Sequence, residues 1–191
     1  MNVLEEAIIF ATKAHEGQTR KLALTPYILH PLEVANIIST ITPDLETAAA
    51  GVLHDTVEDC DVDPKEIRDR FGPRVAALVQ SETEDKLSDR PPAETWQERK
   101  EDSLLMLRNT RDRDVKILWL ADKLANLRSF YRSHCEIGDG LWEHLHQKDP
   151  AKQRWYYETV ADCVRDELAD TAAFREFCEL IPKTFEGGTA L

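Results

Sequence analysis

Four imidazole and carboxylate side chains in one short stretch of this 191-residue sequence have the types and spacing to do chemistry. His54-Asp55 is followed by Glu58-Asp59 within the run AAAGVLHDTVEDCD, residues 48–61. If the run is one helix, side chains four apart share a face, so Glu58 lies over His54 and Asp59 over Asp55. Carboxylates gathered at one helix edge repel each other unless a cation or solvent offsets their charge. The cluster therefore indicates either a divalent-metal site or a solvated acidic helix end.

A further carboxylate lies in the middle of an apolar helical run, VKILWLADKLANLRSF. Asp122 is surrounded there by leucine and alanine, and an unpaired carboxylate buried in hydrocarbon is costly. It is therefore expected to be paired, hydrogen-bonded or bound to a metal. Pairing with Lys123 or Arg128 at the helix surface is the alternative to a metal. Asn126, four residues on, shares the face of Asp122.

His30 is a candidate ligand from a third part of the chain. Pro31 biases it toward an extended conformation and keeps it out of the following helix, so its side chain is expected to project from a loop–helix junction. His30, His54, Asp55 and Asp122 together supply two imidazoles and two carboxylates. Such a mixed set suits Mn²⁺, Fe²⁺ or Zn²⁺ better than Ca²⁺ or Mg²⁺. Four ligands on a larger ion such as Mn²⁺ leave positions for water and substrate.

Helix signals along the chain predict the elements that position these residues. No convincing alternating strand and no internal repeat occurs, so the fold class is expected to be all-α. The start signals are capping boxes at 2–5 and 95–98, Asp or Pro residues at 31, 44, 63, 112 or 114 and 149, and Gly-Pro at 72–73. We expect the long apolar helix to reach Phe130 and the polar stretch 82–94 to be a loop. Residues 1–183 are expected to form one bundle of about eight to ten helices, with a frayed tail at 184–191.

The composition restricts the partners and the compartment. A net charge of −12 disfavours nucleic acid and anionic membranes, although an anionic small molecule remains suitable where positive charge is concentrated. No apolar run approaches the roughly 18 residues that span a bilayer, and the N-terminus does not resemble a signal peptide. The four cysteines form no CxxC and are expected to be reduced thiols. These features predict a cytoplasmic protein.

The order of His30, His54-Asp55 and Asp122 resembles the HD-domain phosphohydrolases. Four segments resemble successive motifs of RelA/SpoT hydrolase domains: QTRK at 18–21, PYILHP at 26–31, LHDTVED at 53–59 and LADKLANL at 120–127. Over residues 3 to about 135 the chain is similar to the stand-alone small alarmone hydrolases of the stringent response, of the metazoan SpoT-homologue type. No second, synthetase-like domain is expected in the remaining residues of this sequence.

The resemblance implies an HD-domain helical bundle and a guanosine-3′,5′-bis(diphosphate) 3′-pyrophosphohydrolase. Such an enzyme hydrolyses (p)ppGpp to GDP or GTP and pyrophosphate, and (p)ppApp is a further candidate substrate. The resemblance also implies one Mn²⁺ held by the four ligand residues, with Zn²⁺ or Fe²⁺ as alternatives. A bound metal would lower the pKa of water from ~15.7 toward neutrality. Glu58, with Asp59, is then expected to orient and deprotonate the water or to protonate the leaving oxygen, and the division of these roles is open.

The resemblance also implies contacts with an anionic nucleotide. Arg20-Lys21 resembles a purine-contacting pair, because a planar guanidinium can stack on a base and Lys brings charge for phosphate. Asn126 resembles a nucleotide-contacting residue, and Lys86 and Arg128 are further phosphate candidates. Residues 22–25, LALT, depart from the more polar family pattern and leave guanine versus adenine specificity open.

Two other functions fit parts of the pattern. The first is an HD-type phosphatase of another nucleotide, such as NADPH or a 5′-mononucleotide, which would share the metal and differ in the base and phosphate contacts. The second is a non-catalytic nucleotide-binding protein, which the complete set of ligands and acids disfavours.

Overall fold

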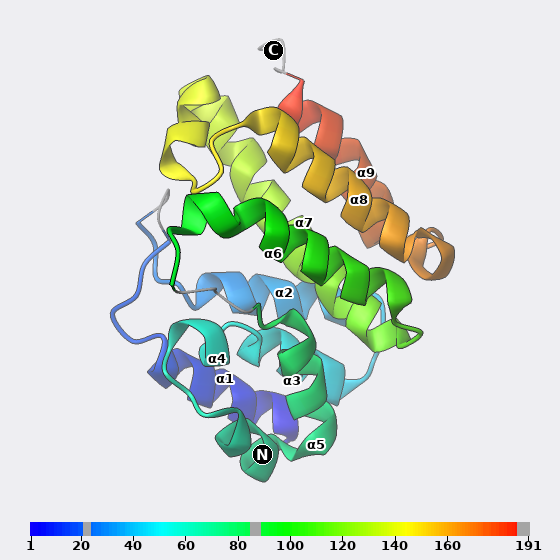
Figure 1. Cartoon of the computed structure of the whole chain (residues 1–191). Coiled ribbons are helices and arrows are strands. Elements are labelled where there is room, and N and C mark those ends of the chain that lie inside the picture. The colour runs from blue at the N-terminus through cyan, green and yellow to red at the C-terminus, as the bar shows by residue number, and fades with distance from the viewer. Residues whose placement is uncertain (21–23, 85–88, 187–191) are drawn as a thin grey trace.

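A computed structural model describes residues 1–20, 24–84 and 89–186 of the chain (Figure 1). Within these ranges the regular structure is helical, apart from one isolated bridge between Thr19 and Pro26, which confirms the predicted all-α class. The elements are α1 Val3–Ala14, α2 Leu29–Ser39, α3 Leu45–Leu53, α4 Thr56–Asp59, α5 Pro64–Glu82, α6 Pro92–Asn109, α7 Arg113–Ile137, the 3₁₀ helix η1 Gly138–His144, α8 Pro150–Leu168 and α9 Ala172–Phe185.

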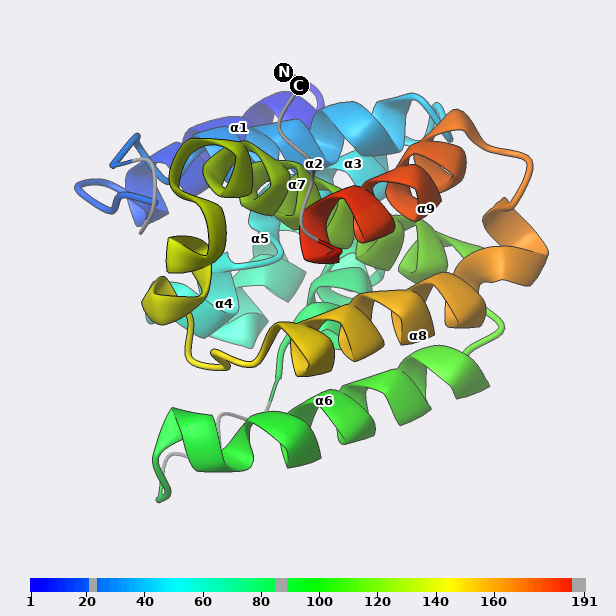
Figure 2. The ribbon, with the colours of Figure 1, turned by 90° about the horizontal axis from the view of Figure 1, so that it is seen from above.

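Helix α7 is the central element of the bundle. It contacts α2, α3 and α5 on one side and α8 and α9 on the other. Figures 1 and 2 show α1 to α5 gathered in one half of the molecule, with α8 and α9 in the other and α6 lying along the outer side of α8. The helix that carries Asp122 therefore lies between the two halves, where a side chain can meet residues from both.

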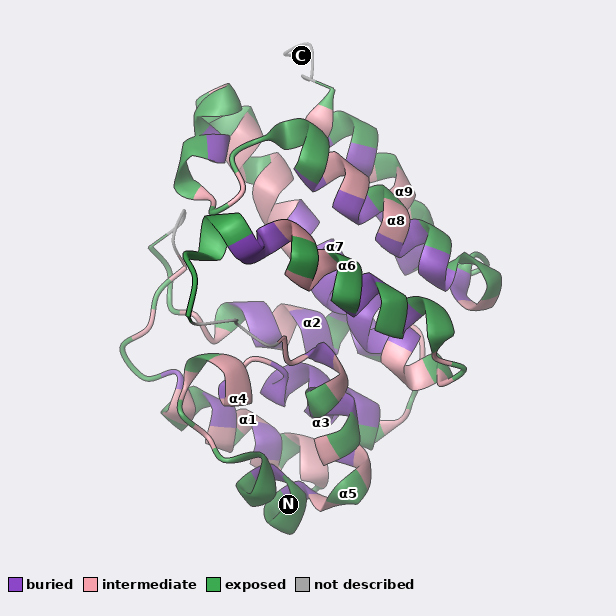
Figure 3. Cartoon of the chain, in the orientation of Figure 1, coloured by how far each residue is buried: buried purple, intermediate pink, exposed green. Residues whose placement is uncertain are grey.

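The core is one continuous cluster of buried apolar side chains that extends from Ala7 to Ile181 (Figure 3). The middle of α7 is buried on every face, because each residue from 116 to 125 is buried. A helix that is buried on all sides is apolar on every face and therefore has little amphipathic pattern. The apolar run in the middle of α7 has this character. Among the described residues no helix is both long and apolar enough to cross a membrane.

Most predicted helix starts are confirmed. Asn2 and Glu5 form a reciprocal capping box, and Asp112 rather than Asp114 caps α7. The side chains of Asp44, Asp63 and Asp149 likewise accept backbone N–H groups at the starts of α3, α5 and α8. Gly72, at φ 90° and ψ 166°, kinks α5 where the Gly-Pro pair was predicted to begin a new helix. Its positive φ favours glycine.

Four predicted boundaries differ from the structure. Helix α2 begins at Leu29, so the expectation that His30 lies outside a helix is wrong: Pro31 sits in the first turn, where its missing N–H is harmless. The capping box predicted at 95–98 is also wrong, because α6 already starts at Pro92. Helix α7 runs on to Ile137, and α9 runs to Phe185 with Thr184 buried, inside the predicted tail.

Gly51 allows α3 to approach α2 closely. A Cβ at this position would lie 2.4 Å from Ile38 Cδ1 and 3.3 Å from Val34 Cγ1. Gly51→Ala is therefore expected to destabilise the protein by about 1–2 kcal/mol, because overpacking exceeds the gain in helix propensity. Ile38→Val removes the clashing methyl group, so the same substitution should cost less in that background.

Urea unfolding of the two single variants and the double variant measures this coupling. Gly140→Ala is the matched control, because its Cβ would meet nothing within 4 Å, and we expect its free energy of unfolding to be near that of the unmodified protein. An equal cost for Gly51→Ala with and without Ile38→Val would contradict the close approach of α2 and α3.

Candidate metal centre

The His54-Asp55 pair lies at a break between two helices. Helix α3 ends at Leu53 and α4 begins at Thr56, so the prediction of one helix through Asp59 is wrong. Two side chains form hydrogen bonds with carbonyl groups near the end of α3. His54 Nδ1 donates to Gly51 O at 2.9 Å, and Thr56 Oγ1 donates to Leu53 O at 2.7 Å. Such bonds compete with continuation of the helix. They also place the proton of neutral His54 on Nδ1 and leave the Nε2 lone pair for a ligand.

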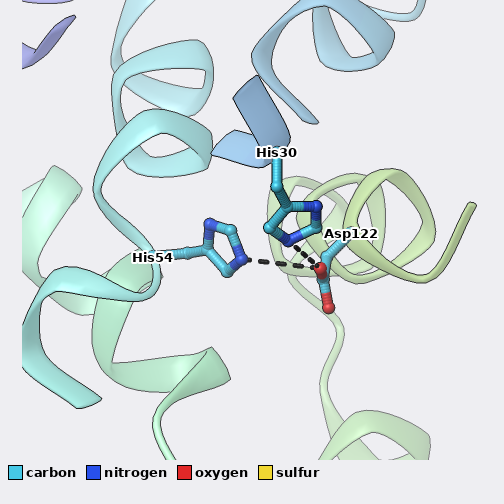
Figure 4. Close-up of side chains that lie close together, drawn as sticks. All are labelled: His30, His54 and Asp122. Atoms are coloured by element: carbon cyan, nitrogen blue, oxygen red, sulfur yellow. Dashed lines mark ion pairs between the residues drawn. The ribbon is translucent and has the colours of Figure 1, made fainter. Parts of the chain in front are cut away.

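Four predicted ligands from three parts of the chain converge at this break. Asp122 Oδ1 on α7 lies 3.0 Å from His30 Nε2 and 3.5 Å from His54 Nε2, as the dashed lines in Figure 4 show. One ligand atom from each of these three buried residues lies within 4.8 Å of the others. Asp55 Oδ2 joins them at 3.0 Å from His54 Nε2 and 3.6 Å from His30 Nε2. His30, His54 and Asp122 thus form one cluster, and the Asp55 carboxylate lies beside it, close to both histidines.

The electrostatics of the cluster favour a bound cation. His54 Nε2 is buried and forms no hydrogen bond with any residue in the described ranges, although two carboxylates are near. Burial alone would lower the pKa of His54, but Asp55 and Asp122 outweigh it and raise the pKa well above its usual value. The pKa values of both carboxyl groups are depressed: burial opposes this, and the neighbouring positive groups prevail. A divalent ion would satisfy the unbonded nitrogen and the two carboxylates together, so the residues fit a metal.

The second oxygen of Asp122 is held away from the cluster. Lys123 Nζ lies 2.5 Å from Asp122 Oδ2 and 3.3 Å from Glu82 Oε2. Burial would lower the pKa of Lys123, but Asp122 and Glu82 raise it well above its usual value, so the lysine is charged. The ion pair that was the sequence-based alternative to a metal is therefore present, yet it uses Oδ2 and leaves Oδ1 facing the histidines. Contacts of this kind orient metal ligands.

Tyr27 holds the other carboxylate. Its hydroxyl donates to Asp55 Oδ2 at 2.7 Å, and burial followed by the charge of Asp55 raises the pKa of the phenol far above its usual range. The phenol therefore stays protonated and acts as a donor. Tyr27 was not predicted from the sequence, because its partner is remote in the chain and a tyrosine before the His-Pro pair gives no signal of its own.

Mn²⁺ binding is expected to release about one proton per ion at neutral pH. In the metal-free protein the raised pKa keeps His54 protonated, and the ion must displace that proton. The apparent Mn²⁺ affinity should therefore fall as the pH decreases below the raised pKa of His54. Calorimetry at pH 7 in buffers of different ionisation enthalpy measures the released proton. An affinity independent of pH between 6 and 8, with no proton released, would contradict the arrangement.

The cluster opens into a cavity of about 290 Å³ that also holds the predicted acid Glu58. Burial, followed by the nearby charge of Asp55, raises the pKa of Glu58 above its usual value. Glu58 Oε2 accepts the backbone N–H of Glu84 at 3.3 Å. Arg99 and Lys100 on α6 bring positive charge to the same cavity, and both pair with Glu84.

Arg99 and Lys100 were not predicted from the sequence. An adjacent Arg-Lys pair is a weak signal on its own. The pair lies in α6, between the predicted segments 53–59 and 120–127 and in neither of them.

A second cavity of about 520 Å³ adjoins the first and receives other predicted residues. Arg20, Asp59 and Asn126 line it, together with Phe130 from α7. Tyr27 and Asn126 line both cavities. The structure therefore separates the two predicted acids, with Glu58 in the cavity of the metal cluster and Asp59 in the neighbouring one.

Of the remaining predicted contacts, only Arg128 lies in the described residues, and it is not brought to the site. Arg128 Nε and Nη2 donate to Glu176 at 2.6 and 2.7 Å, and Nη1 donates to Glu33 at 3.1 Å, so its guanidinium ties α7 to α9 and α2. Arg128 lines neither cavity. Lys21 and Lys86 lie outside the described residues. His146, which was not among the predicted site residues, is exposed and lines the cavity of the metal cluster.

Known proteins share this fold and these motifs. A family model described as HD domain matches residues 7–139. The Vibrio cholerae guanosine-3′,5′-bis(diphosphate) 3′-pyrophosphohydrolase is 39% identical over 132 residues, which are 68% of this chain and 18% of that protein. The Danio rerio guanosine-3′,5′-bis(diphosphate) 3′-pyrophosphohydrolase MESH1 is 41% identical over 134 residues, which are 68% of this chain and 70% of that protein. A solved structure of a metazoan ortholog of SpoT that hydrolyses ppGpp has a TM-score of 0.74 at 27% identity, covering 96% of this chain and 95% of that one.

These matches agree with the site geometry. His30, His54, Asp55 and Asp122 all fall within the matched residues 7–139, and this range is more than half of the chain. The chain spans only 18% of the length of the Vibrio cholerae protein, so similarity to that relative concerns one part of it. Because the HD domain model matches more than half of its residues, the chain belongs to the HD domain family.

Proposed function

We propose that this protein is a metal-dependent hydrolase that removes the 3′-pyrophosphate of (p)ppGpp, giving GDP or GTP and pyrophosphate. The observation that carries the proposal is the convergence of His30, His54 and Asp122 within 4.8 Å, with Asp55 beside them and Glu58 in the same cavity. The printed activities of the Vibrio cholerae and Danio rerio relatives support the substrate. (p)ppApp is a second candidate substrate, since the metal chemistry does not depend on the base.

The cluster would hold one divalent ion, and Mn²⁺ is the ion we propose. Mixed nitrogen and oxygen ligands favour Mn²⁺, Zn²⁺ or Fe²⁺ over Ca²⁺ and Mg²⁺. Mn²⁺ is the largest of the first three and keeps coordination positions free beyond four protein ligands. When bound, the ion would lower the pKa of a water molecule and offset charge on the attacked phosphate.

The protein's own residues supply proton transfer and charge. We assign Glu58 to accept the proton of the attacking water; its position in the cavity of the metal cluster and its raised pKa, which is closer to the range of an effective general base, support this role. Arg99 and Lys100 would offset the negative charge of the pyrophosphate in the same cavity. Asp59 and Arg20 line the adjoining cavity, so we assign them to the nucleoside rather than to the phosphorus chemistry.

The test is purified protein with Mn²⁺, offered ppGpp, ppApp, NADPH and deoxymononucleotides in separate reactions that are followed by product chromatography. The proposal expects GDP and pyrophosphate from ppGpp. Inorganic phosphate released only from NADPH or a mononucleotide would contradict it and favour an HD-type phosphatase of another nucleotide. Binding of ppGpp without turnover by metal-loaded protein would favour a non-catalytic nucleotide-binding protein.

A further inference from the structure

The side-chain amide of Asn126 links the two cavities by hydrogen bonds. Its Nδ2 donates to Asp122 Oδ1 at 2.8 Å, and its Oδ1 accepts from Arg20 Nη2 at 3.1 Å. The orientation of the amide is fixed by its neighbours. A flipped amide would place its oxygen against a carboxylate and its nitrogen against a guanidinium, and both contacts are unfavourable. The Arg20 guanidinium in the second cavity is thus connected through Asn126 to the oxygen of Asp122 that faces the metal cluster.

A second contact runs parallel to the first. The Arg20 guanidinium lies 5.7 Å from the centre of the Tyr27 ring, and the Tyr27 hydroxyl donates to Asp55 Oδ2. Both carboxylates of the metal cluster are therefore reached from Arg20 through a single intervening side chain. The amide is the stronger connection, because both of its contacts are hydrogen bonds and each involves a charged partner.

We propose that Asn126 is a positioning residue that couples nucleoside binding to metal binding. A ligand that engages Arg20 in the second cavity raises the affinity of the cluster for its divalent ion, and the ion raises the affinity for the ligand by the same factor. The proposal rests on the proposed function only for the identity of that ligand as a nucleoside. The relay from Arg20 to Asp122 is a property of the chain itself.

The direction of the coupling follows from the polarity of the amide. The charge of Arg20 on Asn126 Oδ1 polarises the amide and strengthens its N–H donation to Asp122, since hydrogen bonds in a chain reinforce each other. Stronger donation withdraws electron density from the oxygen that faces the metal. A nucleoside that draws Arg20 away weakens this withdrawal and makes Asp122 Oδ1 a better ligand. Arg20 therefore lowers the affinity of the cluster for the metal ion, and the nucleoside raises it.

The first experiment uses the metal alone. Electron paramagnetic resonance of free Mn²⁺ gives the dissociation constant for the unmodified protein, Arg20→Ala, Asn126→Ala and the double variant. Removal of Arg20 is expected to tighten Mn²⁺ binding several-fold when Asn126 is present, and by a clearly smaller factor when it is absent. An equal factor in both backgrounds would mean that Arg20 acts only through space, and it would overturn the relay.

The second experiment adds guanosine, which lacks phosphate and so does not chelate the ion. Saturating guanosine should tighten Mn²⁺ binding by roughly five-fold or more in the unmodified protein, the lower end of typical coupling. The effect should persist in Asn36→Ala, an exposed truncation on α2, and vanish in Asn126→Ala even at guanosine concentrations that saturate that variant. Guanosine that binds without changing the Mn²⁺ affinity would overturn the proposal.

Two features keep these tests decisive. Asn126→Ser repeats both experiments should the alanine variant not fold. Because the first experiment contains no nucleotide, the relay can hold even if ppGpp is not hydrolysed. Conversely, the protein could hydrolyse ppGpp while Arg20→Ala changes the Mn²⁺ affinity equally with and without Asn126. That result would support the proposed function and contradict the relay.

Discussion

Asp122→Asn is expected to abolish turnover by removing the metal. The substitution keeps the shape of the side chain but replaces the anionic oxygen that faces His30 and His54 with an uncharged amide. Loss of even an outer contact to a metal ligand lowers metal affinity by about 10–100-fold, so loss of the ligand's own charge should lower it at least ~100-fold. Equilibrium dialysis against Mn²⁺ and the rate of pyrophosphate release from ppGpp measure the two effects.

Asp114→Asn is the matched control for this variant. Asp114 lies in the first turn of the same helix and pairs with Arg74, away from both cavities. We expect it to bind Mn²⁺ as the unmodified protein does. Near-normal Mn²⁺ affinity in the Asp122 variant would show that this carboxylate is not a ligand. Circular dichroism should accompany both measurements, because Lys123 loses a charged partner in a buried position when Asp122 is replaced.

Glu58→Gln is expected to keep the metal and lose most of the rate. Gln retains an oxygen that can accept the Glu84 N–H, so the local structure should persist. It cannot accept a proton from water, and general-base catalysis contributes about 10²–10⁴-fold. We therefore expect kcat to fall by about that factor while Mn²⁺ affinity and KM change little. Steady-state kinetics at saturating Mn²⁺, with dialysis for metal content, separate the two effects.

Asp59→Asn is the companion variant, because this acid lines the neighbouring cavity. It should raise KM more than it lowers kcat. The opposite pattern, with Glu58→Gln nearly active and Asp59→Asn inactive, would reverse the roles assigned to the two acids.

The sequence predicted the residues of the site better than their local geometry. Asp122 was identifiable because a carboxylate among apolar residues is costly unless it is paired or bound. His54 and Asp55 were identifiable because they belong to a cluster of carboxylates whose repulsion a cation would offset. The helix break at His54 was not predictable from periodicity, because it depends on side-chain bonds from His54 and Thr56 to carbonyls of α3. The placement of His30 was mistaken because the bias of a residue before proline against helical dihedrals is only a preference, and the missing N–H of Pro31 removes no helical hydrogen bond in the first turn.

Long-range partners account for what the sequence could not reveal. Lys123 meets Glu82 across 41 positions, and Tyr27 meets Asp55 across 28. The packing of α7 against α5 brings the first pair together, and the packing of α2 against α3 brings the second. Arg128 illustrates the reverse error, since a basic residue six positions beyond Asp122 looks suited to phosphate until its bonds to Glu176 and Glu33 are seen.

A titration of metal-free protein with Mn²⁺ tests the central claim most directly. Bound Mn²⁺ and the rate of pyrophosphate release from ppGpp are recorded in the same samples. The account predicts about one ion per chain, activity that rises in proportion to occupancy, and neither binding nor activity in Asp122→Asn. Full activity before any metal is added, or full occupancy in that variant, would contradict it.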